Sequence, residues 1–273
     1  MLHIVRHKAP NLGRAPLMSS EATIIDRKLA LYPATLACWS TPNFTLICGA
    51  PGTGKTSLVI RLLKTIYKKT FHDIYACIPE VSLDSIPKSD DVFRKHLDDR
   101  HLFHEFNEDT MNEIYTQLVE NAKDDYNSLL IIDDFGTQLK EGGAGAMLNK
   151  IIIKMRHLKT TVFVLCQNYY QLGKQLREIA TNMILFPSSK SMNEKIFDEL
   201  FDWSKPKFQQ VMDTLEDRHD WLLLNLRNKR MFNHNFHELV FSDDTKYSSD
   251  NDGTGDEETP KTKKKEALTK SRV

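Results

Sequence analysis

The fold of this chain is decided by one stretch, Phe44-Thr45-Leu46-Ile47-Cys48-Gly49-Ala50-Pro51-Gly52-Thr53-Gly54-Lys55-Thr56-Ser57. Residues 44–48 form an apolar run of strand length, and residues 58–66 carry an apolar face with the period of a helix. The residues between them fit the pattern GxxxxGKS/T, in which glycines let successive backbone N–H groups turn toward an anion. A strand, a glycine loop and a helix in this order predict a loop that binds phosphate.

We expect this loop to bind ATP together with Mg²⁺. Lys55 is predicted to reach the β- and γ-phosphates, and the Thr56 hydroxyl to ligate Mg²⁺, while the N-terminus of the following helix attracts the phosphates. The predicted nucleotide-binding residues are Gly49, Ala50, Pro51, Gly52, Thr53, Gly54, Lys55, Thr56 and Ser57. The alternative is a plain glycine turn with an accidental lysine, and the strand and helix on its two sides argue against it.

Two acids, Asp133 and Asp134, follow the apolar residues 129–132. In an open parallel sheet, ligands bind at the carboxyl ends of the strands, so these acids are expected beside the phosphate loop. Asp133 is predicted to hold Mg²⁺ through its water shell, and Asp134 to orient or deprotonate the attacking water. Two acids that merely open a turn are the alternative, and the upstream phosphate loop favours the catalytic interpretation.

A glutamine and two arginines complete the candidate site. Gln167 ends the apolar run 161–166, where its amide can face the γ-phosphate or the attacking water. The alternative is a glutamine that opens an exposed loop. Arg156 precedes this run and Arg177 follows it. An arginine can stabilise transition-state charge in the active site of a neighbouring subunit, and we favour Arg156 over Arg177 for that role. The alternative for each arginine is an ordinary surface residue without a catalytic role.

The stretch Gln138-Leu139-Lys140-Glu141-Gly142-Gly143-Ala144-Gly145 follows the two acids, and its glycines predict a mobile loop. Such a loop can touch a substrate and sense hydrolysis, with Lys140 available to a phosphate. A flexible connection explains the same residues equally well.

The chain divides by composition into three regions. Residues 1–42 are a weakly patterned lead-in segment, and residues 43–241 alternate short apolar runs with amphipathic stretches. This alternation predicts an α/β domain, a P-loop NTPase with a central, mainly parallel sheet flanked by helices. The predicted strands are residues 44–48, 74–78, 129–133, 161–166 and 183–186. The domain is expected to close with a C-terminal helical stretch and a hairpin, whose arms are residues 221–226 and 231–241.

Residues 242–273 have a different composition, in which acidic residues are followed by lysines and aromatic side chains are nearly absent. Such a segment has too little apolar surface to offset the entropy of ordering it. We therefore predict a disordered, charged tail.

The bulk composition narrows the class of protein. Lysine plus arginine equals aspartate plus glutamate at 37 each, so any nucleic-acid surface must be local. The four cysteines lack a paired spacing, which favours a reducing compartment. No apolar stretch approaches the roughly 18 residues of a membrane span. We expect a soluble, intracellular protein without a membrane partner.

The motifs together resemble the genome-packaging ATPases of large eukaryotic DNA viruses, virophages and polinton-like elements, the poxvirus-type branch of the FtsK–HerA superfamily. The resemblance covers roughly residues 43–241. Beyond the phosphate loop it rests on four features: Asp133-Asp134, Arg156-His157, Gln167-Asn168, and Leu176-Arg177 followed by Asn182-Met183-Ile184-Leu185-Phe186.

The resemblance implies an ATPase that forms a homo-oligomeric ring and pumps double-stranded DNA into a preformed capsid, with DNA-stimulated turnover. It implies capsid portal or vertex proteins as partners, and a place in the host cytoplasm or nucleus, or with the virion, during virion assembly. By resemblance Lys55 and Thr56 are the Walker A pair, Asp133 and Asp134 the Walker B acids, Gln167 the sensor and Arg156 the arginine finger. Many members of the superfamily carry Asp-Glu where this chain has Asp133-Asp134.

Two other functions fit the same motifs. One is a ring ATPase of the AAA type, such as a helicase loader. The other is a scaffold that binds ATP as a switch and hydrolyses it weakly. Stimulation of turnover by DNA separates a DNA motor from the scaffold.

Overall fold

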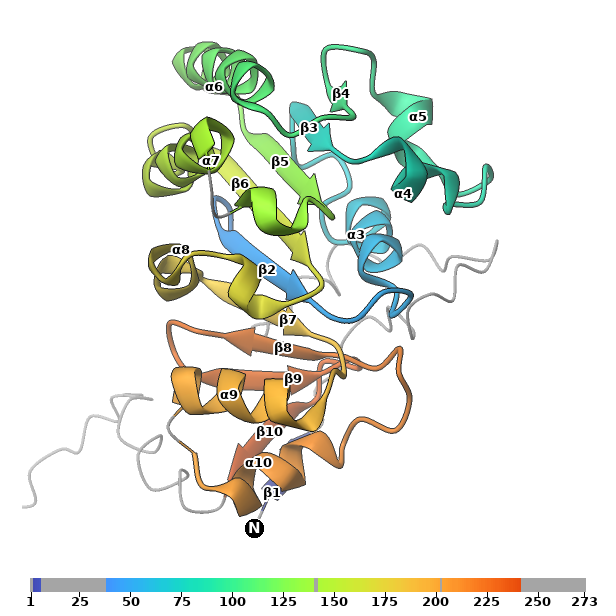
Figure 1. Ribbon diagram of the computed structural model, residues 1–273, viewed down its shortest axis with the longest axis vertical. Coiled ribbons are helices and arrows are strands. Elements are labelled where there is room, and N and C mark those ends of the chain that lie inside the picture. Colours follow the sequence, from blue (N-terminus) through green and yellow to red (C-terminus); the bar gives the residue numbers. More distant parts are fainter. Residues whose placement is uncertain (1, 6–37, 140–141, 202, 242–273) are drawn as a thin grey trace, which may run out of the picture.

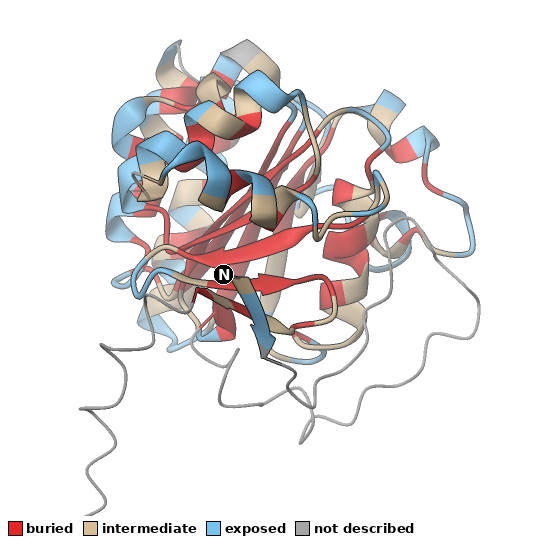
Figure 2. Ribbon diagram, turned by 90° about the horizontal axis from the view of Figure 1, so that it is seen from below, coloured by how far each residue is buried: buried red, intermediate tan, exposed pale blue. Residues whose placement is uncertain are grey.

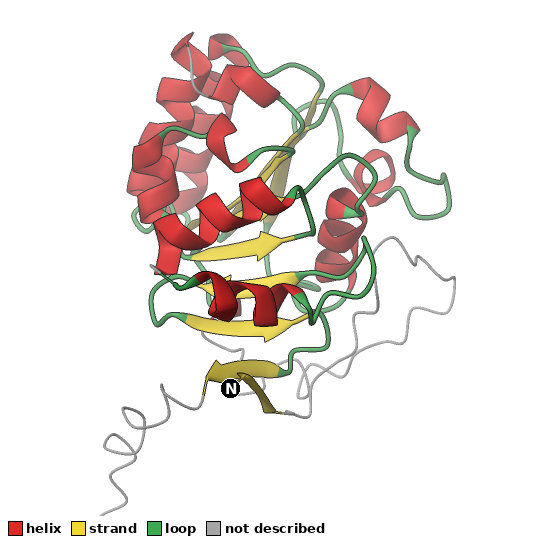
Figure 3. Cartoon of the chain, turned by 60° about the horizontal axis from the view of Figure 1, so that its bottom comes forward, coloured by secondary structure: helices red, strands yellow, loops and turns green. Residues whose placement is uncertain are grey.

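The computed structural model describes residues 2–5, 38–139, 142–201 and 203–241. Most of the predicted lead-in segment, the predicted tail and Lys140 lie outside the described residues. Within them, a ten-stranded mixed sheet carries helices on both of its faces, which gives three layers (Figures 1 and 3). This is the predicted α/β architecture with a mainly parallel centre.

The parallel part of the sheet has the order β7-β2-β6-β5-β3-β4. Its strands are β2 (Phe44–Cys48), β3 (Asp73–Cys77), β4 (Leu102–Phe103), β5 (Ser128–Asp133), β6 (Thr160–Cys166) and β7 (Asn182–Leu185). Strands β2, β5, β6 and β7 are buried at every position, because helices and loops cover both faces. Near-continuous apolar sequence is typical of such strands, and this is why their positions were predictable.

The sheet continues past β7 with antiparallel strands in the order β8, β9, β10 and β1. Their bounds are Leu222–Asn225, Arg230–Asn233, Glu238–Phe241 and Leu2–Val5. The predicted hairpin arm 231–241 is therefore wrong as one strand, since it holds both β9 and β10. Asn233 causes the break between β9 and β10, because its side-chain oxygen accepts hydrogen bonds from the backbone N–H groups of Asn235 and His237. Phe236, in the same turn, has a left-handed φ of 57°.

Helices α6 (Glu108–Lys123), α7 (Gly142–Lys154), α8 (Lys174–Ile179), α9 (Lys190–Phe201) and α10 (Lys205–Met212) cover one face of the sheet. Helices α3 (Lys55–Lys64), α4 (Glu80–Asp84) and α5 (Val92–His96) lie on the other face. Buried residues gather on the strands and on the helix faces turned toward them, as Figure 2 shows.

Alternate side chains of each strand enter different cores. Leu46 and Cys48 of β2 belong to the core under α6 to α10, whereas Ile47 belongs to the core under α3. Leu130 and Leu129 of β5 divide in the same way. This period of two fixes which groups at the end of each strand face the same side.

The glycine-rich residues 142–145 are the first turn of α7, so the prediction of a mobile loop there is wrong for the described residues. A 3₁₀ turn, Gly136–Leu139, precedes them. Gly145 favours close packing, because a Cβ atom there would lie 3.1 Å from the Leu139 carbonyl oxygen, and the neighbouring backbone would have to move slightly. The glycines bring α7 close to the turn that follows Asp134, and they do not loosen it.

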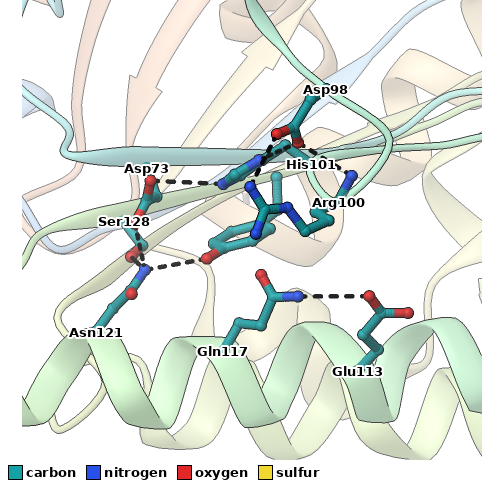
Figure 4. A network of polar contacts seen from close by, with 9 residues as sticks. Asp73, Asp98, Arg100, His101, Glu113, Gln117, Asn121 and Ser128 are labelled. Carbon is teal, nitrogen blue, oxygen red and sulfur yellow. Dashed lines mark hydrogen bonds and ion pairs between the residues drawn. The ribbon is translucent and has the colours of Figure 1, made fainter.

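A polar network ties α6 to the β3 side of the sheet (Figure 4). The Nδ2 atom of Asn121 lies within hydrogen-bond distance of Asp73 Oδ2 (2.8 Å), Tyr75 Oη (3.1 Å) and Ser128 Oγ (3.1 Å). His101 stacks on the Tyr75 ring and lies between Asp73 and Asp98. The hydrogen bond from His101 holds the pKa of Asp98 below its usual value. The network therefore connects α6 with β3, with the start of β5 and with the residues before β4.

No helix among the described residues has both the length and the hydrophobicity that crossing a membrane requires.

Candidate active site

The phosphate loop lies at the carboxyl end of β2, between the ends of β6 and β7, which both pair with β2 in parallel. The Gly49 N–H donates to the Cys166 carbonyl (3.2 Å) and so ties the loop to β6. A Cβ atom at Gly49 would lie 2.6 Å from Cβ of Phe186, so only glycine fits there. Gly52 and Gly54 have φ values of 73° and 98°, the left-handed region that glycine adopts without strain.

Lys55 begins α3 and is buried, with 9% of its surface exposed. Its ammonium group donates to the carbonyls of Gly49 (2.8 Å) and Ala50 (3.1 Å). The loop also closes on itself, because the Thr53 hydroxyl donates to the same Ala50 carbonyl (2.9 Å). The predicted phosphate-binding lysine is thus held inside the curve of the loop at the N-terminus of a ten-residue helix.

Thr56, in the first turn of α3, meets Asp133 at the end of β5. The Thr56 hydroxyl donates to Asp133 Oδ2 at 2.7 Å, although 77 residues separate them in sequence. Asp133 is 2% exposed, and burial raises its pKa to about 6; the hydrogen bond from Thr56 and the charge of Lys55 oppose this rise, and Asp134 adds to it. A hydroxyl and a carboxylate are the hard oxygen ligands that Mg²⁺ prefers, so this pair fits the predicted metal position.

Asp134 and Gln167 form a second pair at the same edge of the sheet. The Gln167 side-chain amide donates to Asp134 Oδ1 at 2.6 Å, and both side chains are exposed. Asp134 has a left-handed backbone with φ of 61°, a conformation that aspartate tolerates better than most residues. The two groups that the sequence assigned to the attacking water therefore touch each other.

Two buried thiols lie under this edge. Cys48 and Cys166 are register partners that directly precede Gly49 and Gln167, and their sulfur atoms are 2.9 Å apart. The hydrogen bond with Cys166, together with burial, raises the pKa of Cys48 well above its usual value. Both thiols therefore serve here as small buried side chains, as the apolar sequence around them predicts.

The two candidate arginines lie in different surroundings. Arg156 is exposed between the end of α7 and the start of β6, so it lies at the edge of the sheet opposite the phosphate loop. Arg177 is buried, and its guanidinium donates to both carboxylate oxygens of Glu199 (2.9 and 3.2 Å) and to the Leu172 carbonyl (2.7 Å). Arg177 is thus committed to contacts within its own chain, which leaves Arg156 the better candidate for a neighbour's site.

Sequence reasoning missed one part of the site. His219 contacts the Thr53 carbonyl through Nδ1 (3.2 Å), and Arg218 lies beside Gly52. No local pattern marks these residues. Their contact with the loop depends on the antiparallel pairing of β8 with β7, a long-range feature that the sequence alone does not reveal.

The family model described as Poxvirus A32 protein matches residues 40–252 of this chain. The chain belongs to the Poxvirus A32 protein family. Its phosphate loop and strand-end acids make this A32-family chain a P-loop ATPase. No curated protein matches its sequence.

Solved structures similar to this A32-family chain include the DNA-packaging ATPase B204 from Sulfolobus Turreted Icosahedral Virus. It is 17% identical, with a TM-score of 0.53 over 71% of this chain and 98% of B204. The genome packaging NTPase B204 from Sulfolobus turreted icosahedral virus 2 in complex with AMPPCP is also 17% identical, with a TM-score of 0.51 over 71% and 97% of the two chains. At this identity the likeness shows a common fold.

Asp133→Asn is expected to stabilise the metal-free and nucleotide-free protein at pH 7.5 by about 1–3 kcal/mol, because asparagine keeps the acceptor for Thr56 without the buried charge. Folding raises the pKa of Asp133 to about 6, so the wild type gains stability from protonation at low pH and loses it as the pH rises through 6. The difference between variant and wild type should therefore shrink at pH 5. Urea unfolding at pH 7.5 and at pH 5 measures this difference in the free energy of unfolding. Substitution of the exposed Asp99 by asparagine is the control. Equal stability of Asp133→Asn and wild type at pH 7.5 would contradict this reading.

Proposed function

We propose that this chain is an ATP-hydrolysing motor that moves double-stranded DNA into a viral capsid. The observation that carries the proposal is the meeting of the Thr56–Asp133 pair and the Asp134–Gln167 pair beside the phosphate loop. Membership of the Poxvirus A32 protein family and the likeness in fold to a protein described as a DNA-packaging ATPase support it.

Each residue at the loop has a role in this proposal. Lys55 and the loop N–H groups bind the β- and γ-phosphates, and Ser57 follows Thr56 into the same helix turn. Thr56 and Asp133 would hold Mg²⁺, which supplies positive charge to the phosphate oxygens when it is bound. These roles rest on residue type and on the geometry above.

The water that attacks the γ-phosphate is proposed to bind at Asp134. That carboxylate is exposed at the sheet edge, so it can accept a proton from water, and the Gln167 amide fixes its direction. Because Gln167 directly follows β6, a change at the γ-phosphate can reach β6 through this one hydrogen bond. Gln167 would in this way report which nucleotide is bound.

The position of Arg156 favours action in a neighbouring subunit. It lies at the amino edge of the sheet, away from the phosphate loop of its own chain. In a head-to-tail ring, different faces of adjacent subunits meet, so this edge of one subunit can approach the nucleotide edge of the next. We propose Arg156 as the arginine finger of a homo-oligomeric ring.

A packaging motor acts together with further partners. Double-stranded DNA is the substrate, capsid portal or vertex proteins are the docking partners, and the site of virion assembly inside the host cell is the location. Membership of the Poxvirus A32 protein family supports these assignments.

Asp134→Asn should keep ATP binding and lower the rate of hydrolysis at least about 100-fold, because it removes the base but not the phosphate contacts. Lys55→Ala should abolish both, because it removes the cation that contacts the phosphates. Phosphate release and displacement of a fluorescent ATP analogue measure the two properties, with Asp99→Asn as the control. Wild-type turnover in Asp134→Asn would show that another group activates the water.

Duplex DNA is expected to raise the rate of ATP hydrolysis, because a motor couples its nucleotide site to its track. The stimulation should fall steeply with salt, since phosphate contacts release condensed counterions. It should also be nearly independent of DNA sequence, because backbone contacts carry no sequence information. Turnover that is indifferent to duplex DNA over a range of salt concentrations would refute the motor.

Arg156→Ala subunits mixed with wild type are expected to lower the rate of hydrolysis more than in proportion to their fraction, because a site without its arginine also stops the other sites of a ring that hydrolyses ATP in sequence. Activity is measured over a series of mixing ratios at constant total protein. Arg100→Ala serves as the matched control, since the Arg100 side chain is 78% exposed. A strictly proportional loss would show that the sites hydrolyse ATP independently, and it would contradict a ring that works in sequence.

A further inference from the structure

The segment between α10 and β8 crosses beside the phosphate loop, although more than 160 residues separate the two in sequence. In Figure 1 it lies at the same end of the strands as the loop between β2 and α3, the end at which the β2 arrow finishes. Asp220, which is fully buried, shapes its turn by accepting the backbone N–H groups of Glu216 (2.8 Å) and Asp217 (2.9 Å). The turn is therefore built on a buried carboxylate and presents its next side chains in a fixed direction.

His219 connects this turn to the phosphate loop. Its Nδ1 atom lies 3.2 Å from the Thr53 carbonyl oxygen, which can only accept, so Nδ1 carries the proton. Its Nε2 atom then has a lone pair, and the Arg218 Nε–H donates to it at 3.1 Å. A chain of two hydrogen bonds thus runs from the loop backbone through the imidazole to the guanidinium.

Arg218 is held over the outer side of the loop by this chain. Its Nη2 atom lies 4.0 Å from the position that a Cβ of Gly52 would occupy. Gly52 itself is exposed, and so is the Arg218 side chain. The guanidinium therefore borders the mouth of the nucleotide site and is open to a ligand there.

The strand order shows which end of a nucleotide lies near Arg218. The groups proposed for hydrolysis lie on one side of the loop: Asp133 ends β5, and Asp134 and Gln167 directly follow β5 and β6. The turn that bears Arg218 leads into β8, whose first residue pairs with the last residue of β7 on the other side. A triphosphate whose γ-phosphate points toward β5 and β6 extends its nucleoside toward β7 and β8.

We propose that Arg218 binds the nucleoside end of ATP, with its guanidinium plane against the face of the base. Arginine stacks on aromatic rings through its flat, weakly hydrated guanidinium, and a base offers such a face. His219 is the positioning residue, which holds Arg218 in place and links it to the loop that grips the phosphates. The inference rests on nucleotide binding at the phosphate loop, because without it Arg218 has no ligand.

Arg218→Ala is expected to weaken the binding of ATP and of ADP by the same factor, about tenfold, since both nucleotides share the base. Inorganic tripolyphosphate should bind the variant as it binds the wild type. Arg218→Lys should resemble Arg218→Ala, because lysine keeps the charge and lacks the plane. Displacement of a fluorescent ATP analogue from the full chain measures all three ligands. Arg227→Ala is the matched control, an exposed arginine just beyond the other end of β8.

Three results would overturn the inference. Unchanged ATP affinity in Arg218→Ala excludes the contact altogether. A loss for ATP without a loss for ADP moves the contact to the γ-phosphate, and an equal loss for tripolyphosphate shows a phosphate contact or a damaged loop. A wild type that binds no nucleotide would instead refute the proposed function, and Lys55→Ala with its loss of all three ligands provides that reference.

His219→Ala tests the positioning role. It should weaken the binding of ATP and ADP, yet add little to the loss in a chain that already carries Arg218→Ala, because both act through one guanidinium. Additive losses in the double variant would show that His219 supports the loop by itself and does not act through Arg218.

Discussion

Strand β2 pairs in parallel with β6 on one side and with β7 on the other, so the loop that follows it is placed between two sets of strand ends. Everything else at the site follows from this pairing. The ends of β6 and β5 bring Gln167 and the two acids to one side of the loop. The end of β7 and its antiparallel partner β8 bring the turn of residues 216–220 to the other side. Asp134 and Gln167 need no long connection, because they are the first residues beyond β5 and β6.

The electrostatics of the site follow from burial at this edge. Lys55 and Asp133 are both nearly inaccessible to solvent. Backbone carbonyl groups of the loop accept hydrogen bonds from Lys55, and the Thr56 hydroxyl donates one to Asp133. Burial of a carboxylate is unfavourable, which the raised pKa of Asp133 records. The protein therefore maintains a costly charge before any ligand arrives. A bound nucleotide with its cation supplies the opposite charges, so ligand binding and stability of the site are coupled.

The buried part of the fold was predictable and the exposed connections were not. The bounds of β2 follow from its sequence, because a strand covered on both faces must be apolar at nearly every position. Residues 231–241 were wrongly predicted as one strand. The turn between β9 and β10 is made by Asn233 and a left-handed Phe236, and not by glycine or proline, which would have marked it in the sequence. The glycines at residues 142–145 suggested a loop, yet they serve close packing of α7.

The candidate site divides in the same way. Asp133 and Gln167 end or follow apolar runs that mark their strands, and the glycine motif after β2 marks Lys55 and Thr56, so their meeting could be inferred from a parallel sheet. Arg218 and His219 lie in a polar turn, and only the antiparallel return of β8 brings them to the loop. The pairing of Arg177 with Glu199 could not be predicted either, because it joins α8 to α9, which strand β7 separates in the sequence.

The second acid of the pair shows how backbone conformation selects a side chain. Directly after the first acid, Asp133, this chain carries a second aspartate, Asp134, whose side chain is one methylene shorter than that of glutamate. Asp134 has a left-handed φ of 61°, and its carboxylate is held by the Gln167 amide at 2.6 Å. Among residues with a Cβ, aspartate and asparagine enter this region most readily, whereas other side chains there cost roughly 1–2 kcal/mol. The turned backbone directs the short side chain toward β6, and the amide then fixes it. The shorter acid therefore fits this strand end because its position comes from the backbone and from Gln167, and not from the reach of a longer side chain.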